Sequence, residues 1–231
     1  MPLTAVLSSG LTESLKKGDA VAERTDGLYR AITYPKIQRG LMLALGANRA
    51  LSRYAGILDV RPGMHMLDVG CGTANIVAYL PEGVDYIGFD RNAQHVEFAK
   101  ARYSARAPQV RFFAGDATSE DVPGQFDLIN VSALLHHIDD AAAARMLAGL
   151  AAKLRPGGRL VTFDNVWLPN QRYLVRLVNS LDSGKNIRTP EQYVGLLRGL
   201  DLEVETRTVH DMLTIPYDHF IMICKARAAA H

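Results

Sequence analysis

The 231-residue sequence is poor in cysteine, carries little net charge and contains no long hydrophobic run. Its two cysteines, Cys71 and Cys224, lie far apart, and Cys71 falls in a glycine-rich segment where a disulfide would obstruct a ligand. We therefore expect two free thiols and a reducing compartment. No apolar stretch reaches the roughly 18 residues that a membrane-spanning helix needs. Residues 1–10 lack the basic-then-apolar order of a signal peptide, so the expected location is cytoplasmic.

The charge balance argues against nucleic-acid binding and against an acidic tail. The sequence has 26 Lys and Arg residues against 24 Asp and Glu residues, a net charge of +2. Such a balance provides neither the basic surface of a nucleic-acid-binding protein nor an acidic tail. The expected partner is a small molecule, without nucleic acid or membrane insertion, and a homodimer is left open. With 48% apolar residues, the chain suits one globular domain with a sizeable core.

Strand-like and helix-like segments alternate through the middle of the chain. Residues 1–60 have helical spacing, and Pro62-Gly63 marks the turn that ends them. Five strands then follow, at about 64–69, 84–89, 110–114, 126–131 and 159–163. The alternation predicts an α/β fold, with a parallel sheet covered by helices on both faces.

The ends of these segments carry recognisable signals. Asn92 is expected to cap a helix that runs to about Ser104, and Asp139 or Asp140 to cap the helix before the fifth strand. Near the end of the chain, residues 202–209 and 219–225 are two strand-like runs joined by a short link. They predict an antiparallel pair at one edge of the sheet.

The most informative segment is residues 67–74, Leu-Asp-Val-Gly-Cys-Gly-Thr-Ala. Its apolar start is typical of a buried parallel strand. Gly70 and Gly72 follow where the chain must turn sharply and where a ligand can approach the backbone. A helix is expected from Thr73 to Leu80, with its free N–H groups and the positive end of its dipole directed back at the loop.

This loop resembles motif I of the class I S-adenosylmethionine (AdoMet) methyltransferases, (D/E)-x-G-x-G-x-G. Asp68, Gly70 and Gly72 match the motif, and Ala74 stands at the third glycine, where a small residue allows close packing. The turn at residues 154–158, Leu-Arg-Pro-Gly-Gly, also resembles the family and extends the resemblance over residues 60–165. The resemblance implies a Rossmann-like, mostly parallel seven-stranded sheet with an antiparallel closing strand.

The resemblance also implies how a single domain, residues 1–231, is divided. It gives an N-terminal helical cap (1–60), a cofactor-binding core (61–164), a lid insertion between strands five and six (165–200) and closing strands (201–225). In the family, the cap and the lid cover the substrate. Tyr34 and Arg39 would hold the cofactor's carboxylate, although surface or packing roles suit both equally well. The same alternatives apply to the residues that would line the acceptor pocket: Arg172, Tyr173, Arg188, Tyr217 and His219.

AdoMet is the cofactor that the resemblance implies, held by residues at the ends of the first four strands. Asp90 lies 20 residues after Gly70, where a carboxylate can accept both ribose hydroxyls. Arg91 would lie on the adenine or simply be exposed. Asp116 would accept from the adenine amino group, with the backbone N–H of Ala117 as a second contact. The remaining cofactor-binding residues are Asp68, Gly70, Cys71, Gly72 and Ser132.

A nicotinamide-dependent dehydrogenase is the main competing interpretation, because Asp90 also suits NAD. The dinucleotide pattern G-x-G-x-x-G, however, needs glycine where this chain has Asn75. Asp68 would also bring negative charge close to a pyrophosphate, whereas the cationic AdoMet tolerates an acid nearby. Methyl transfer is therefore the favoured interpretation. It depends on the strand-end acids Asp68, Asp90 and Asp116 converging on the cofactor.

The candidate catalytic residues follow strands four and five. His136 and His137 resemble the histidines that many small-molecule methyltransferases carry after the fourth strand, and imidazole can accept a proton near neutral pH. We expect one of the two to be structural and the other to face the acceptor, with a slight preference for His137. Asp164, at the end of strand five, would orient a histidine or bind a hydroxyl.

The absence of two other motifs narrows the chemistry. Cation-dependent catechol-type enzymes need a further Asp after strand four, where this chain has residues 130–133, Asn-Val-Ser-Ala, so no essential metal is expected. Enzymes that methylate the amines of nucleic-acid bases carry (D/N/S)-P-P-(Y/F/W) there, which is also missing. The predicted function is methylation of a hydroxyl on a sugar, lipid-linked or secondary-metabolite acceptor. The alternatives are N-methylation of a small molecule and a non-catalytic AdoMet-binding protein or subunit.

Overall fold

A computed structural model describes residues 47–115, 122, 124–182, 184–210, 212 and 217–227. Most of the expected N-terminal cap, including Tyr34 and Arg39, lies outside the described residues. Asp116 and Ala117 lie outside them as well.

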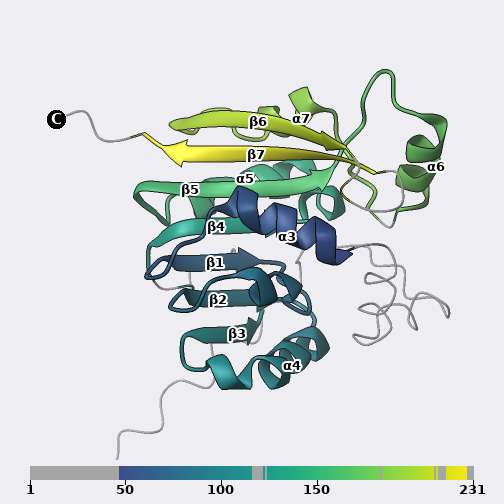
Figure 1. The fold of residues 1–231 in the computed structure, drawn as a ribbon. Helices are drawn as coiled ribbons and strands as arrows, with labels where there is room; N and C mark the ends of the chain where they lie inside the picture. Colours follow the sequence, from purple (N-terminus) through teal and green to yellow (C-terminus); the bar gives the residue numbers. More distant parts are fainter. Residues whose placement is uncertain are drawn as a thin grey trace, which may run out of the picture.

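The described chain forms one seven-stranded sheet in the order β3-β2-β1-β4-β5-β7-β6 (Figure 1). The strands are β1 (His65–Val69), β2 (Asp85–Asp90), β3 (Val110–Ala114), β4 (Phe126–Ser132), β5 (Leu154–Asn165), β6 (Leu202–His210) and β7 (Asp218–Ala226). Strands β1 to β5 are parallel, and β7 runs antiparallel to both of its neighbours, β5 and β6. The Rossmann-like sheet with an antiparallel closing strand is thereby confirmed.

The helices follow the capping signals closely. They are α3 (Ala47–Leu58), η1 (Asn75–Tyr79), α4 (Ala93–Arg102), η2 (Ser104–Arg106), η3 (Leu135–His137), α5 (Asp140–Ala151), α6 (Tyr173–Leu181) and α7 (Pro190–Gly195). The Asn92 side chain accepts from the backbone N–H of Gln94, and Asp139 accepts from that of Ala142, so both predicted caps are confirmed.

Two elements differ from the sequence-based expectation. The segment after the glycine loop is a short 3₁₀-helix, η1, rather than an α-helix from Thr73 to Leu80. Strand β5 begins at Leu154 instead of Arg159, and a register irregularity opposite Phe126 and Leu128 accommodates the extra residues. The cause is local, because a bulge lets a strand continue through an irregular segment that a sequence pattern marks as a turn.

The sheet separates two hydrophobic cores. Helix α5 packs on one face, where Leu147 and Leu150 meet Leu67, Ile129 and Leu160. Helices α3 and α4 belong to the other core. There Tyr54, Leu58, Val96 and Ala99 meet Met66, Leu128 and Ile221. Helices on both faces satisfy the rule that a parallel sheet is buried on both sides.

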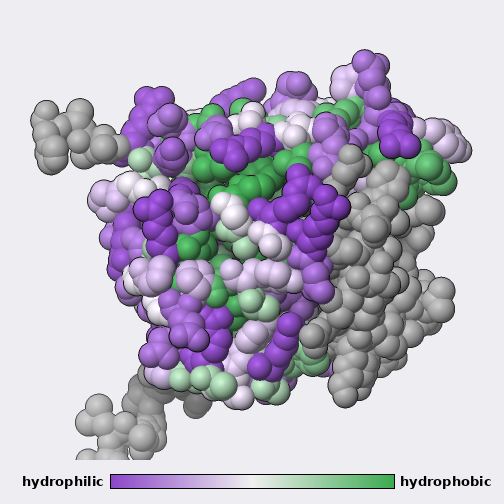
Figure 2. Space-filling model, viewed as in Figure 1, coloured by the Kyte–Doolittle hydropathy of each residue, from purple (hydrophilic) through white to green (hydrophobic). Residues whose placement is uncertain are grey.

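The strand order changes direction between β1 and β4, and ligands in such sheets bind beyond the carboxyl ends of the strands at that point. Helices α6 and α7 are inserted between β5 and β6. Figure 1 shows α6 just beyond the carboxyl end of β5. The space-filling view (Figure 2) shows a mostly hydrophilic face with apolar residues over β5 and β7 and at α6. None of the helices in the described part of the chain has the length and apolarity needed to span a bilayer.

Candidate functional site

The glycine-rich loop joins β1 to η1 and turns onto the end of β2. Gly70 and Gly72 have φ values of 73° and 53°, a conformation that favours glycine because it has no Cβ. The backbone N–H groups of Gly70 and Cys71 both donate to the carbonyl oxygen of Phe89, at 2.8 and 2.9 Å. Ala74 also has a positive φ, 52°. The third glycine position of the motif therefore requires a left-handed backbone here, in addition to a small side chain.

Asp90 ends β2 and is tied to this loop. Its Oδ2 accepts from the backbone N–H of Gly72 and its Oδ1 from that of Asn92, both at 2.8 Å. Burial opposes ionisation, but hydrogen bonds from His95, Asn92 and Gly72 outweigh it and lower the pKa of Asp90. Asp90 is therefore a carboxylate held beside the loop at the carboxyl end of β2. Its binding of a ribose stays a prediction.

Asp68 is engaged within the protein, which differs from the expected convergence of three acids on a ligand. It is 3% exposed, and its two oxygens accept from the Tyr86 hydroxyl at 2.6 Å and the Asn130 side-chain amide at 2.7 Å. The Tyr54 hydroxyl donates in turn to Asn130 at 2.6 Å. Burial raises the pKa of Asp68 to about 6, although the hydrogen bonds from Tyr86 and Asn130 partly offset it. The alternation of β1 is the cause, because it places Asp68 with Met66 on the face that α3 covers.

The remaining predicted cofactor residues have mixed environments. Ser132 ends β4 beside the change of strand order and is partly exposed. Arg91 is exposed at the end of β2. Burial raises the pKa of the Cys71 thiol well above its usual range, so this side chain is neutral. Cys71 and Cys224 are both free thiols.

The two candidate histidines lie on η3, which follows β4. The buried Arg188 guanidinium holds this turn: it donates to the carbonyl oxygens of Leu135 and Ile138, each at 2.7 Å. It also forms an ion pair with Asp140 at 2.7 Å. Arg188 was a candidate for the acceptor pocket, but its side chain is 4% exposed and binds the backbone. Its contacts assign it a structural role.

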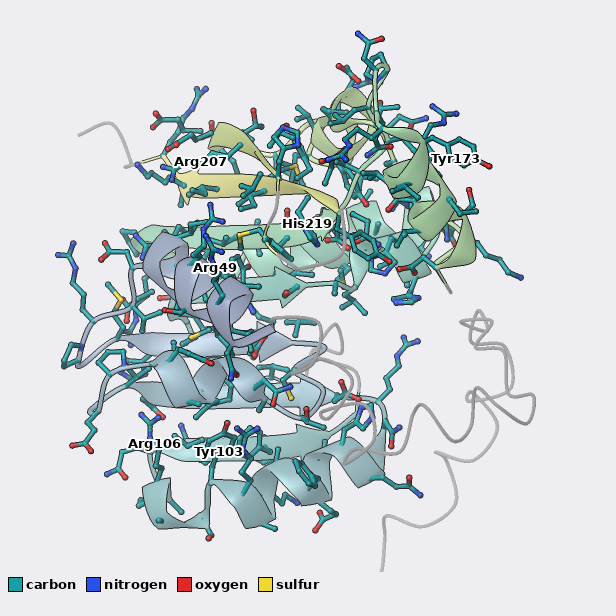
Figure 3. The ribbon with its side chains drawn as sticks, turned by 45° about the vertical axis from the view of Figure 1, so that its right-hand side comes forward. Arg49, Tyr103, Arg106, Tyr173, Arg207 and His219 are labelled. Carbon is teal, nitrogen blue, oxygen red and sulfur yellow. The ribbon has the colours of Figure 1, made fainter. Side chains whose placement is uncertain are left out.

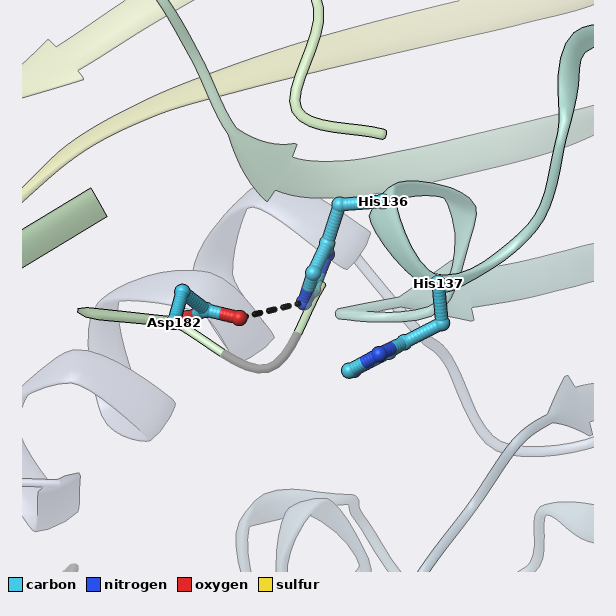
Figure 4. A group of neighbouring side chains, drawn as sticks. All are labelled: His136, His137 and Asp182. Carbon is cyan, nitrogen blue, oxygen red and sulfur yellow. Dashed lines mark ion pairs between the residues drawn. The ribbon is translucent and has the colours of Figure 1, made fainter. Parts of the chain in front are cut away.

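His136 lies between two carboxylates. Its Nδ1 is 2.7 Å from Oδ1 of Asp164, and its Nε2 is 3.6 Å from Oδ1 of Asp182 (Figure 4). Burial disfavours the imidazolium, but the hydrogen bond and the negative charge of Asp164, together with the charge of Asp182, raise the pKa of His136. For Asp164, burial has the opposite effect and raises the pKa, because it disfavours the charged carboxylate. This pair joins the carboxyl ends of β4 and β5.

His137 differs from its neighbour. It is partly exposed, and its ring lies 4.1 Å from that of His136, between centroids. Burial, with a smaller effect of His136, lowers the pKa of His137 to about 4. His137 is therefore a neutral imidazole at neutral pH.

The lid contributes a residue that sequence reasoning missed. This residue is Asp182, which follows α6. Its Oδ2 accepts from the Asn165 amide at 3.0 Å and from the Tyr217 hydroxyl at 3.2 Å. Among the described residues, His136, His137 and Asp182 bring their ligand atoms within 4.8 Å of one another. Proximity of Asp182 to the histidines depends on how the insertion folds back, and no motif in the sequence signals it.

The other lid candidates point in different directions. His219 is buried and its ring stacks on that of Phe163, with 4.4 Å between centroids. Burial lowers the pKa of His219 to about 4. Tyr173 is 77% exposed on α6 and projects outward, as Figure 3 shows. Arg172 is also exposed. Tyr217 contacts Asp182, so Tyr217 and His219 lie nearer the histidines than the residues of α6 do.

Comparison with known proteins finds similarity to methyltransferases over part of the chain. Residues 66–158 match the family model described as a methyltransferase domain. Phosphoethanolamine N-methyltransferase 3 of Arabidopsis thaliana is 28% identical over 149 residues, which are 63% of this chain and 29% of that protein. O-methyltransferase cnsE of Penicillium expansum is 38% identical over 125 residues, 50% of this chain and 44% of that protein. The chain thus spans less than half the length of these two relatives.

Solved structures share the fold. The pyocyanin biosynthetic protein PhzM has a TM-score of 0.68 and is 21% identical, over 85% of this chain and 61% of that one. At this identity the likeness concerns the fold alone.

Proposed function

Because residues 66–158 match the model of a methyltransferase domain, we propose that the protein transfers a methyl group from AdoMet to a hydroxyl of a small-molecule acceptor. The observation that carries the proposal is the joint placement of a glycine loop tied to Asp90 and a histidine pair at the neighbouring strand ends. The glycine loop with Asp90 is suited to binding a nucleoside, and the histidine pair is suited to removing a proton.

The residues of the cofactor side fit an adenosyl ligand. Among the described residues, no atom lies within 4 Å of the position of a Cβ at Gly72, so these residues leave the backbone of the loop open to a ligand there. Asp90 keeps acceptor capacity at Oδ2, which receives one backbone hydrogen bond, from Gly72, of the two that it can accept, whereas Oδ1 has both Asn92 and His95 as partners. Gly70, Gly72, Asp90 and Ser132 would hold AdoMet, which supplies an electrophilic methyl group on a sulfonium. Asp68 would act through Tyr86 and Asn130, by fixing the end of β1.

On the acceptor side, His137 is the better candidate for the base. It is partly exposed and neutral, so its ring can accept the proton of a hydroxyl as the methyl group is transferred. His136 is buried and bound to Asp164, and it supports His137 through the ring contact. Alignment and exclusion of water would provide most of the remaining rate acceleration.

The low pKa of His137 narrows the acceptor class. A weak base works best when the proton that it removes is itself acidic. An acidic hydroxyl of a secondary metabolite therefore suits this base better than a sugar alcohol. An amine acceptor is the second candidate, supported by the relative named as a phosphoethanolamine N-methyltransferase. A cytoplasmic location and a homodimer stay predictions.

Isothermal titration with AdoMet and a labelled-methyl transfer assay test this proposal together. Asp90→Ala should abolish AdoMet binding, because it removes the ribose acceptor and releases the N–H of Gly72. His137→Ala should bind AdoMet normally and slow transfer to hydroxyl acceptors by about 10²-fold or more.

The matched control is Asp85→Ala, which changes an acid at the opposite end of β2 and should leave both measurements unchanged. Normal AdoMet binding by folded Asp90→Ala would contradict the cofactor site. An unchanged transfer rate in His137→Ala would contradict the base. Binding of AdoMet without transfer to any hydroxyl or amine acceptor would favour a non-catalytic binding protein.

A further inference from the structure

We propose that His136, His137 and Asp182 form a binding site for a divalent transition-metal ion of the zinc class. Two imidazole nitrogens and one carboxylate oxygen are a ligand set that Zn²⁺ accepts, and three protein ligands leave one position open. These residues differ from residues 130–133, where the cation-dependent catechol-type enzymes carry a metal-binding Asp. Its proximity arises from folding, since η3 and the loop after α6 are 45 residues apart along the chain (Figure 4).

The separation of the ligand atoms suits a metal better than a direct contact. Nε2 of His136 and Oδ1 of Asp182 are 3.6 Å apart, which is too long for a hydrogen bond. Two ligands that bind zinc tetrahedrally at about 2.0–2.2 Å lie roughly 3.4 Å from each other. A His137 ring nitrogen lies within 4.8 Å of both atoms. Because His137 is partly exposed, a modest side-chain rotation can bring it closer.

The surrounding groups orient the ligands as in a metal site. Nδ1 of His136 lies 2.7 Å from Oδ1 of Asp164, and with the ring proton on Nδ1 a metal ion could take the lone pair of Nε2 on the side of Asp182. A buried carboxylate behind a histidine is the usual outer partner of a metal-bound imidazole. Asp182 is held in the same way, since Asn165 and Tyr217 both donate to its Oδ2. Its Oδ1 accepts one hydrogen bond, from the backbone N–H of Gly184, and keeps further acceptor capacity.

The electrostatic balance also favours a cation. The carboxyl groups of Asp164 and Asp182 flank a single imidazole, and the nearby Arg188 is already paired with Asp140 and the backbone of η3. A divalent ion would compensate the negative charge. The consequence for transfer rests on the proposed function: with the ion bound, His137 would be a ligand and could not act as the base, so Zn²⁺ would inhibit methyl transfer to a hydroxyl.

The binding claim can be tested without AdoMet or acceptor. Tag-free protein, treated with a chelator and dialysed, is titrated with Zn²⁺ by calorimetry and with Co²⁺ by visible absorption. We expect one ion per chain and the intense absorption of a low-symmetry Co²⁺ site. His137→Gln and Asp182→Asn, at partly exposed positions, should each weaken binding by about 10-fold or more, and Asp164→Asn by about 10–100-fold as an outer partner. His65→Gln, at the amino end of β1 and therefore at the opposite edge of the sheet, is the control and should bind as the unchanged protein does.

A second pair of variants removes no ligand. A Cβ at Gly184 would lie 2.1 Å from Cδ2 of His136, so Gly184→Ala must displace the loop that carries Asp182. It should weaken Zn²⁺ binding, whereas Gly195→Ala, with no atom within 4 Å of its Cβ position, should not. Absence of stoichiometric binding, or equal affinity in folded His137→Gln and Asp182→Asn, would overturn the metal site. Neither result would affect the AdoMet site, which Asp90→Ala tests separately.

Discussion

Two adjacent histidines show how strongly the environment of one residue decides its chemistry. His136 lies between two carboxylates, which raise its pKa. His137, one residue later, has a pKa lowered to about 4, because burial is not compensated by a hydrogen-bonded acid. Sequence reasoning expected one structural and one active histidine. The carboxylates of Asp164 and Asp182 support His136 as the structural histidine and His137 as the active one. The His137→Ala experiment tests this assignment.

A pH-dependent stability is expected from Asp68. Its pKa in the folded protein is raised to about 6, so the unfolded chain binds fewer protons than the folded one between about pH 4 and pH 6. The stabilisation is complete below about pH 4 and is lost as the pH rises through 6. Asp68→Asn carries no charge. The free energy of unfolding of Asp68→Asn should therefore rise relative to that of the unchanged protein, by about 2 kcal/mol between pH 4 and pH 7.

Urea denaturation of the ligand-free proteins at pH 4, 5, 6 and 7 measures this difference. Asp127→Asn is a suitable control, because Asp127 is partly exposed and accepts hydrogen bonds from His65 and Arg155. Its difference from the unchanged protein should not show the same rise. A difference for Asp68→Asn that stays constant with pH would show that Asp68 is ionised throughout.

At the scale of the element, the short helix η3 depends on a residue far along the chain. Arg188 satisfies two carbonyl oxygens of the η3 region and pairs with Asp140 at the start of α5. A 3₁₀ turn of three residues has little stability of its own. The insertion that carries Arg188 therefore also holds the candidate catalytic turn in place.

Arg188→Met should lower the free energy of unfolding by about 3 kcal/mol, because the carbonyl of Ile138 loses its guanidinium donor and that of Leu135 keeps only the backbone N–H of Ile138. It should also slow methyl transfer more than it weakens AdoMet binding, since η3 moves and the glycine loop does not. Thermal unfolding and the transfer assay measure the two effects. Arg198→Met, at an exposed position on the same insertion, should change neither. A stable, fully active Arg188→Met would show that η3 does not need this clamp.

Local sequence patterns predicted where helices begin, but they did not predict the form of the helix after the glycine loop. The N-caps Asn92 and Asp139 were predicted because a single side chain decides a helix start. The segment after the glycine loop was expected to be α-helical, and it is 3₁₀, because Ala74 takes a left-handed conformation just before it. Neighbouring residues constrain a cap, whereas packing against α3 and β2 constrains the form of η1.

At the scale of the whole molecule, the sheet keeps two cores apart. Ile129 on β4 faces the core of α5, and Ile221 on β7 faces the core of α3. Both side chains are fully buried. Leu147 of α5 belongs with Ile129. Changes in different cores should therefore act independently.

Double-mutant cycles measured by urea denaturation test this separation. Leu147→Ala should cost about 3 kcal/mol, and Ile129→Val or Ile221→Val about 1 kcal/mol each. The combination of Leu147→Ala with Ile221→Val should be additive within about 0.5 kcal/mol. The combination of Leu147→Ala with Ile129→Val, in the same core, should deviate from additivity by more than this. Equal coupling in both pairs would mean that the sheet does not isolate its two faces.

The sequence by itself determined the α/β class, the seven strands with an antiparallel closing strand, and the glycine loop followed by an acid at the end of β2. The α/β alternation and the strand ends follow from hydrophobic periodicity and local residue preferences, whereas the seven-stranded sheet with its closing strand follows from the family resemblance. Only the tertiary structure decided that Asp68 is occupied by Tyr86 and Asn130, that Arg188 is a clamp and that Asp182 reaches His136. Each of these contacts joins residues that are distant along the chain, and their meeting depends on how the strands align and the insertion folds back.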